Sequence, residues 1–117
     1  MSAASLIRAQ GGGATLTVNL MTSRRDGVEA EIRDWGPDGP TLDCWVQPIG
    51  SGLAAQYQAR QLRVTHKIFV AENPGATQEG CRVKVTKSGA VGVYLVRGVV
   101  DQAGLGRLWR IDVEEVH

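Results

Sequence analysis

The side chains of this 117-residue sequence that could take part in catalysis do not have the spacing that an active site requires. His66, in the segment "RVTHKIFV", is in phase with Val64 and Ile68. Because side chains alternate between the two faces of a strand, the imidazole is predicted to face the apolar side. A general base needs a nucleophile or carboxylate within reach, and the adjacent Thr65 and Lys67 are predicted to point away. We therefore predict a structural histidine in the core.

The cysteines do not suggest a metal site. Cys44 and Cys81 lack a Cys-x-x-Cys spacing, and zinc requires four ligands at close spacing. The N-terminal stretch "MSAASLIRAQGGG" has no apolar h-region, so we predict no signal peptide. Both cysteines are therefore predicted to be reduced and buried. No apolar run is long enough to cross a bilayer, so we expect no membrane partner.

The glycines at 11–13 do not form a phosphate-binding loop, since such loops follow a strand and open a helix. Here they precede a predicted strand, and we predict that residues 1–13 form a flexible N-terminal arm. The acidic pair Glu29 and Glu31 falls on an outward strand face, where solvation is the expected state. We therefore predict no catalytic residue, no cofactor and no metal, and a protein that is not an enzyme.

Hydrophobic alternation predicts an all-β fold. In "TLTVNLM", Leu16, Val18 and Leu20 share one face, which is typical of a half-buried strand. About seven such segments, with frequent glycines between them, favour a single domain over 1–117 built as a small antiparallel β-barrel or sandwich. The predicted strands are 15–21, 28–35, 41–49, 61–70, 81–87, 91–100 and 107–116. The predicted core comprises Leu62, Val64, Ile68, Val70, Val83, Val85, Ile111 and Val113. Segment 91–100 is apolar on both faces, so both faces are expected to be covered.

The connector from Gln47 to Gln61 is long for a compact β-domain. Residues 50–61 suit either a long loop or a short helix capped by Ser51, with Leu53 and Tyr57 one turn apart. The segment has few large apolar groups, so we expect it to be mobile in an isolated subunit.

Charge is divided unevenly along the chain. Residues 60–97 carry a net charge of +5, and the remainder carries −4. If strands 61–70 and 81–87 pair as neighbours across the Pro74-Gly75 turn, their basic residues share one outward face. That face is either an ordinary solvated surface or a contact with other copies or with a polyanion. The candidate residues for a DNA channel or subunit interface are Arg60, Arg63, Lys67, Arg82, Lys84 and Lys87.

The order of several segments is similar to that of a known family. "DCWVQPIGSG", "QARQLRVTHKIFV", "GCRVKV", "VGVYLVRGVVDQAG" and "LWRIDVEEV" follow one another between residues 40 and 116. In this order the chain resembles the head-tail joining proteins of tailed bacteriophages, with the closest likeness to the head-closure or stopper group. An arginine that often follows the histidine-bearing strand is missing, so adaptor and tail-completion proteins remain alternatives.

The resemblance implies a structural virion protein without a catalytic site. Such proteins are made in the host cytoplasm and form rings, here of six or twelve copies, in the virion neck. The implied partners are other copies, portal or adaptor proteins, tail terminator or tail tube proteins, and the genomic DNA that the ring retains. The resemblance also favours a gating or contact role for part of the connector. The residues concerned are Gly50, Ser51, Gly52, Leu53, Gln56, Tyr57 and Gln58.

A small oligonucleotide-binding β-barrel is the competing class. It needs exposed aromatic side chains that stack on bases beside a basic groove. Only Phe69 shares the predicted outward phase of Arg63 and Lys67, so a single aromatic ring would be available to stack on bases.

Overall fold

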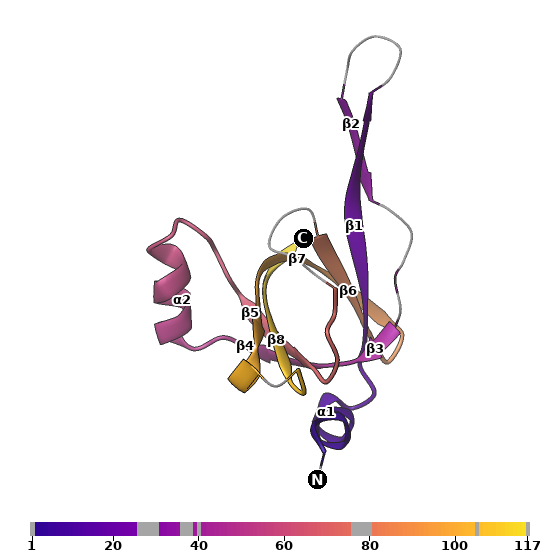
Figure 1. The fold of residues 1–117 in the computed structure, drawn as a ribbon, viewed down its shortest axis with the longest axis vertical. Coiled ribbons are helices and arrows are strands. Elements are labelled where there is room, and N and C mark those ends of the chain that lie inside the picture. Colours follow the sequence, from indigo (N-terminus) through magenta and orange to yellow (C-terminus); the bar gives the residue numbers. More distant parts are fainter. Residues whose placement is uncertain are drawn as a thin grey trace.

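The protein folds into a curled, all-antiparallel β-sheet with two short helices, as seen in a computed structural model (Figure 1). The structure describes residues 2–25, 31–35, 39, 41–75, 81–104 and 106–116. The strands are β1 (Thr15–Arg25), β2 (Glu31–Trp35), β3 (Thr41–Asp43), β4 (Trp45–Pro48), β5 (His66–Val70), β6 (Cys81–Lys87), β7 (Ala90–Asp101) and β8 (Trp109–Val116). The helices are α1 (Ala3–Gly11), α2 (Ser51–Gln58) and the short 3₁₀ helix η1 (Gln102–Gly104). The predicted small all-β fold is confirmed.

The sheet closes into a barrel through one interrupted strand. The strand order is β2-β1-β6-β7-β8-β5-β4, and β3 pairs with β1. Because β3 and β4 follow each other in the chain, the predicted strand 41–49 spans both edges of the curled sheet. The break falls at Cys44, whose backbone N–H donates to the Ala14 carbonyl at 3.1 Å.

The predicted pairing of segments 61–70 and 81–87 is wrong. β5 pairs with β4 and β8, whereas β6 pairs with β1 and β7. Two strands therefore separate β5 from β6. The Pro74-Gly75 turn between them begins a longer crossover rather than a hairpin, and residues 76–80 lie outside the described part of the chain.

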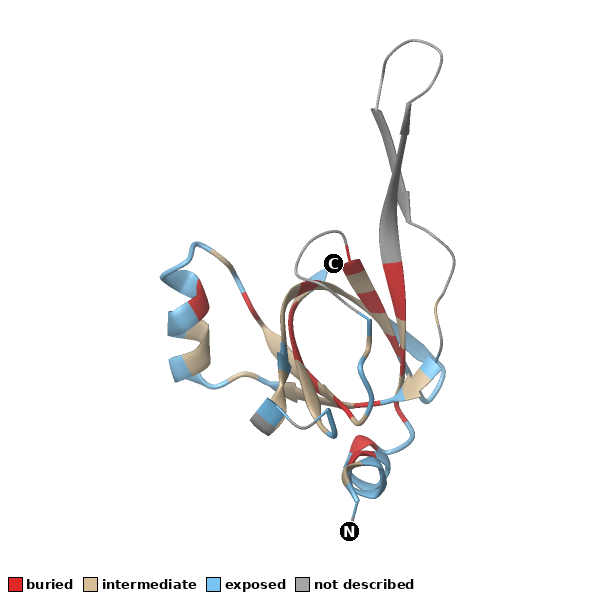
Figure 2. Ribbon diagram, in the orientation of Figure 1, coloured by how far each residue is buried: buried red, intermediate tan, exposed pale blue. Residues whose placement is uncertain are grey.

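The predicted core register is confirmed. Seven of the eight predicted core residues are buried, and only Leu62, in the irregular segment before β5, is half-buried. Six of the buried seven belong to one core cluster, which Ala14, Leu16, Val18, Cys44, Cys81 and Val96 complete; Val64 is buried outside it. Figure 2 shows this buried face lining the inside of the barrel. The basic side chains at 63, 67, 82 and 84 are outside that core, as their alternation predicts.

Residues 3–11 form a helix, so the prediction of a flexible arm over 1–13 is wrong. The Ser2 hydroxyl caps α1 by accepting from the Ser5 N–H at 3.2 Å. Ile7 is fully buried and anchors the helix against the sheet. Gly12 ends the helix at φ 63°, a conformation that favours glycine. The glycines that suggest a hinge therefore provide a helix cap and a tight entry into β1.

The outer half of β1 extends beyond the barrel with β2 (Figure 1). Residues 21–25 pair with residues 31–35, in register from Met21 with Trp35 to Arg25 with Glu31. The first part of the predicted strand 28–35, including Glu29, lies outside the described residues. Among the described helices, none is long and apolar enough to span a membrane.

Candidate functional site

The six predicted basic residues fall into separate groups on the barrel. Arg82 and Lys84 lie side by side on the outer face of β6, opposite Asn19 and Thr17 of β1. Arg82 donates to the Asn19 side-chain oxygen at 3.2 Å. Arg60, Arg63 and Lys67 lie on the other side of β7 and β8, around α2 and β5. The structure therefore does not bring the predicted basic residues into one patch.

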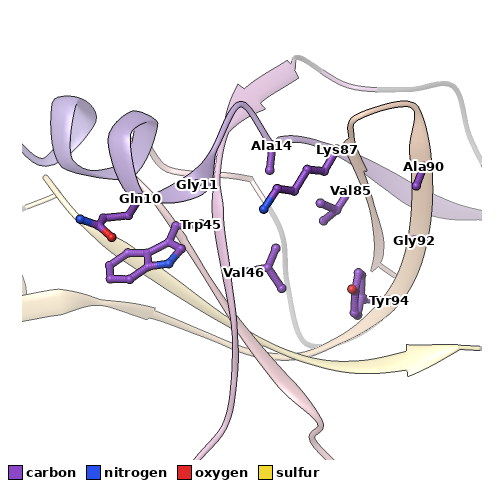
Figure 3. Close-up of a pocket in the computed structure, with 10 residues that line it drawn as sticks. All are labelled: Gln10, Gly11, Ala14, Trp45, Val46, Val85, Lys87, Ala90, Gly92 and Tyr94. Atoms are coloured by element: carbon purple, nitrogen blue, oxygen red, sulfur yellow. The ribbon is translucent and has the colours of Figure 1, made fainter.

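Lys87, the sixth of these residues, lines a cavity at the mouth of the barrel beneath α1. The cavity has a volume of about 270 Å³. It is lined by Gln10, Gly11, Ala14, Trp45, Val46, Val85, Lys87, Ala90, Gly92 and Tyr94. Figure 3 shows the Lys87 ammonium reaching back from the end of β6 into this space. A cation beside the C-terminus of α1 is favoured by the helix dipole, which gives Lys87 a structural reason for its place.

A second cluster joins two aromatic rings and a cation on the outer wall. Trp45 and Phe69 are directly opposite each other on β4 and β5, with ring centroids 5.6 Å apart. The Lys67 ammonium lies 5.8 Å from the Phe69 ring centroid, within cation–π range. The alternation of the sequence predicted that Phe69 faces outward but did not predict its contact with Trp45. That contact depends on the strand break at Cys44 and on the pairing of β4 with β5.

Of the two alternatives for residues 50–61, a long loop or a short helix, the structure has the helix over most of the segment, and one of its residues ties it to the barrel. Gly50, rather than Ser51, occupies the N-cap position of α2. Five of the predicted contact residues are exposed: Gly50, Ser51, Gly52, Gln56 and Gln58. Leu53 is half-buried, and Tyr57 is 7% exposed. Tyr57 is the only buried residue of α2. The expectation that this segment is mobile rested on its few large apolar groups, and Tyr57 is one such group that does pack against the barrel.

Tyr57 reaches a fully buried carboxylate. Its hydroxyl donates to Asp112 Oδ2 at 2.5 Å, and the Arg110 Nε lies 2.9 Å from Asp112 Oδ1. Asp112 is on the outer face of β8 and is 0% exposed. Gly98 faces it across the β7–β8 ladder, next to a bulge at residues 96–98. A β-carbon at Gly98 would collide with the Tyr57 hydroxyl, so glycine is what admits this contact.

Burial and the neighbouring Asp112 change the acidity of Tyr57. Burial of the hydroxyl, its hydrogen bond to Asp112 and that carboxylate's charge raise the pKa of Tyr57 to about 12. The neutral phenol is therefore preferred in the folded protein, and it loses its proton only at a pH above that of an ordinary tyrosine. Asp112, Arg110 and Gly98 were not predicted from the sequence, because no local pattern links residues 55 positions apart.

Replacing Tyr57 with phenylalanine is expected to lower the free energy of unfolding by about 1–3 kcal/mol, because a buried carboxylate loses a hydrogen-bond donor. The wild-type protein should also lose stability between pH 10 and 12, since the unfolded chain releases this proton first. The phenylalanine variant should lack that component of the pH slope. Urea unfolding at pH 7, 10 and 11 measures both effects, and equal slopes would contradict the assignment.

His66 lies on the inner face of β5 and is half-buried. Its Nδ1 is 2.9 Å from the Thr65 hydroxyl, and its ring meets the Tyr94 ring edge-on at 5.5 Å. Thr65 in turn accepts from the Glu115 N–H at 2.8 Å. These contacts join β5, β7 and β8, as expected of a structural histidine; Thr65 is part of this network and does not point away.

Replacing His66 with glutamine is expected to lower the free energy of unfolding by about 0.5–1.5 kcal/mol through loss of the aromatic contact. The amide retains hydrogen bonding to Thr65, so association of the folded protein should not change. Thermal melting and light scattering measure the two properties. Loss of association with an unchanged melting temperature would assign the imidazole a direct role instead.

Within the described ranges, no group of three or more His, Cys, Asp or Glu side chains is arranged to hold a metal ion. Both cysteines are free and buried. Burial, together with the charge of Asp43, raises the pKa of the Cys44 thiol to about 12.

Comparison with known proteins gives a fold but no family. No protein-family model matches the chain, and no curated protein does so either. The chain is similar to protein SF1141 from Shigella flexneri 2a, with a TM-score of 0.65 and 24% identity over 86% of this chain and 89% of that one. It is also similar to a chain in the virion of a native gene transfer agent particle, with a TM-score of 0.49 and 15% identity over 87% and 93% of the two chains. The likeness to SF1141 shows a common fold, and one fold serves many functions.

Proposed function

We propose that the protein is a structural component of a tailed-phage neck, where a ring of copies joins the DNA-filled head to the tail and helps to retain the genome. The observation that carries this proposal is the order of segments between residues 40 and 116, which resembles that of head-closure proteins. In the fold, those segments are β3 to β8 with α2, which together make up most of the barrel wall.

The barrel supports association through side chains and projecting elements. A closed barrel leaves few free strand edges, so copies meet through their outer walls. Basic residues on β6 and acidic residues on β8, such as Glu115 and Glu114 (which also pairs with Arg97 of β7 at 3.2 Å), lie on opposite sides of β7. Opposed charges on two sides of a subunit suit a heterologous contact, in which one surface meets a different surface of the next copy.

A DNA-retaining ring also needs basic side chains toward its channel. Arg60, Arg63 and Lys67, next to α2, are the group that we assign to this role. Contacts between such residues and phosphates are independent of DNA sequence and weaken strongly with salt. Retention of DNA in filled heads should accordingly depend on these residues and on ionic strength.

Interrupting the coding sequence of this chain in the genome that carries it tests the proposal. We expect head particles that fill with DNA but lack tails and then lose their genome, and supplying the chain in trans should restore tailed particles. Electron microscopy and nuclease-protected DNA measure both outcomes. Normal yields of tailed, infectious particles would overturn the proposal.

An oligonucleotide-binding barrel is the second candidate, favoured by the outer-wall cluster of Trp45, Phe69 and Lys67. Base stacking on Phe69 or Trp45 would quench tryptophan fluorescence upon titration with a single-stranded oligonucleotide. Quenching that disappears in Phe69→Ala, but not in Val91→Ala, would support this function over the structural one.

A further inference from the structure

An apolar groove lies beside α2, and we call it the α2 groove. It has a volume of about 580 Å³. Its lining consists of Ala54, Gln58, Gln61, Leu62, Arg63 and Val64. The groove forms because α2 stands away from the barrel (Figure 1) and is tied to it through Tyr57. Leu62 remains half-buried although the sequence assigns it to the core.

The α2 groove is electropositive. Residues 50–64 include Arg60 and Arg63 and no acidic residue. Arg60 lies over the Tyr57 ring, with its guanidinium carbon 5.5 Å from the ring centroid. Arg63 is exposed, and no ion pair is recorded for it among the described residues. An occupant of this groove should therefore combine an aliphatic side chain with a carboxylate.

The end of β8 supplies both groups on adjacent residues, whose side chains project to opposite faces of the strand. Val116 is 42% exposed, one of few large apolar residues of the described chain that are so open to solvent. Glu115 beside it is exposed, and it too has no ion-pair partner in the described ranges. Figure 2 shows this end of the chain exposed. We call residues 114–116 the β8 tail.

The β8 tail and the α2 groove lie next to each other on one side of the molecule. The Thr65 N–H donates to the Val113 carbonyl at 2.9 Å, and the Glu115 N–H donates to the Thr65 hydroxyl at 2.8 Å. The β8 tail is therefore hydrogen-bonded to Thr65, which follows Arg63 by two residues in the chain. When two complementary surfaces lie side by side on one copy, a two-fold axis brings each of them against its complement on the second copy. Both contacts then form in one interface.

We propose that two copies of this chain form a two-fold dimer in which the β8 tail of each copy occupies the α2 groove of the other. Val116 packs against Leu62 and Val64 of the second copy, and Glu115 pairs with its Arg63. Because the dimer is two-fold symmetric, each of these contacts occurs twice in the interface. A specific interface covers about 800 Å² per partner, roughly a tenth of the 7294 Å² surface of one copy. This dimer uses Arg63, which the proposed ring would turn toward its DNA channel, and the end of β8, so the dimer and the ring are alternative assemblies of the same chain.

Sedimentation equilibrium of the purified full chain tests the dimer. The weight-average mass should rise with concentration from 12.5 kDa to twice that value. Arg63→Glu and Glu115→Arg should each raise the dissociation constant about tenfold, because each replaces two attractions with two repulsions. The double variant, which exchanges the charges, should restore wild-type association. Arg107→Glu, an exposed charge reversal away from both surfaces, should leave association unchanged.

Val116→Ser tests the apolar part of the contact without disturbing the core, since Val116 is exposed, and it should weaken dimerisation. A wild-type chain that remains monomeric at millimolar concentration would overturn the dimer. Single charge variants that associate like the wild type would do the same, as would a double variant that fails to recover.

Discussion

Replacing Ile68 with alanine is expected to lower the free energy of unfolding by about 2–5 kcal/mol, because a fully buried isoleucine leaves a cavity. Ile68 is 0% exposed and lies between Val46 of β4 and Ile111 of β8 in the sheet register. Backbone hydrogen bonds hold these strands in place on both sides, so the barrel wall cannot collapse fully into the space. A small domain has only about 5–15 kcal/mol of stability, so this change removes a large share of it.

Urea unfolding followed by circular dichroism measures the loss for Ile68→Ala. Val91→Ala is the matched control, because Val91 is 60% exposed and its truncation should change stability by less than about 0.5 kcal/mol. Equal losses in the two variants would mean that the inner face of β5 is not the core of the folded protein.

The inner register of the barrel was predictable because it depends on local alternation. His66, Ile68 and Val70 share a face in any strand over this segment, and the same holds for Cys81, Val83 and Val85. Which strands lie side by side depends on contacts between distant segments. The Pro74-Gly75 turn favoured a β5–β6 hairpin, yet β7 and β8 lie between the two strands.

The N-terminal helix shows a different kind of error. Ser2, Ile7 and Gly12 are a helix cap, a buried anchor and a helix end in the structure, and these signals are present in the sequence. The three consecutive glycines outweighed them in the prediction. The expected cover on both faces of β7 was also wrong in part, because Val91 is open to solvent and the recorded α2 contact is at Gly98.

The contact that fixes α2 could not be predicted from the sequence. From the sequence, Asp112 is predicted to be an ordinary outward-facing residue of an alternating strand. Tyr57 is one of few apolar residues in a polar connector, and nothing nearby indicates a partner for it. Their hydrogen bond depends on the β7 bulge, on Gly98 and on the path of residues 59–65. Functional elements that depend on such distant contacts become visible only with the fold.

Deleting residues 51–58 is expected to leave the barrel folded and to abolish head-tail joining, if the proposed neck function holds. Tyr57 is the only buried residue of α2, and the remaining segment 59–65 is irregular enough to connect β4 to β5. Asp112 would then become solvated and stay paired with Arg110, which avoids a buried unpaired charge. The deletion also removes one wall of the α2 groove and the Tyr57 ring over which the Arg60 guanidinium lies.

Circular dichroism and protease resistance report the fold of the deletion variant, and counts of DNA-filled, tailed particles report its function. Gly52→Ala is the matched control in α2. The added methyl group meets no atom within 4 Å, and alanine favours helix over glycine by about 1 kcal/mol, so this variant should assemble normally. Normal particle yields from the deletion would show that α2 is dispensable for joining. An unfolded deletion variant would instead make α2 part of the folding unit, and Tyr57→Phe would then separate the anchoring of α2 from the integrity of the barrel.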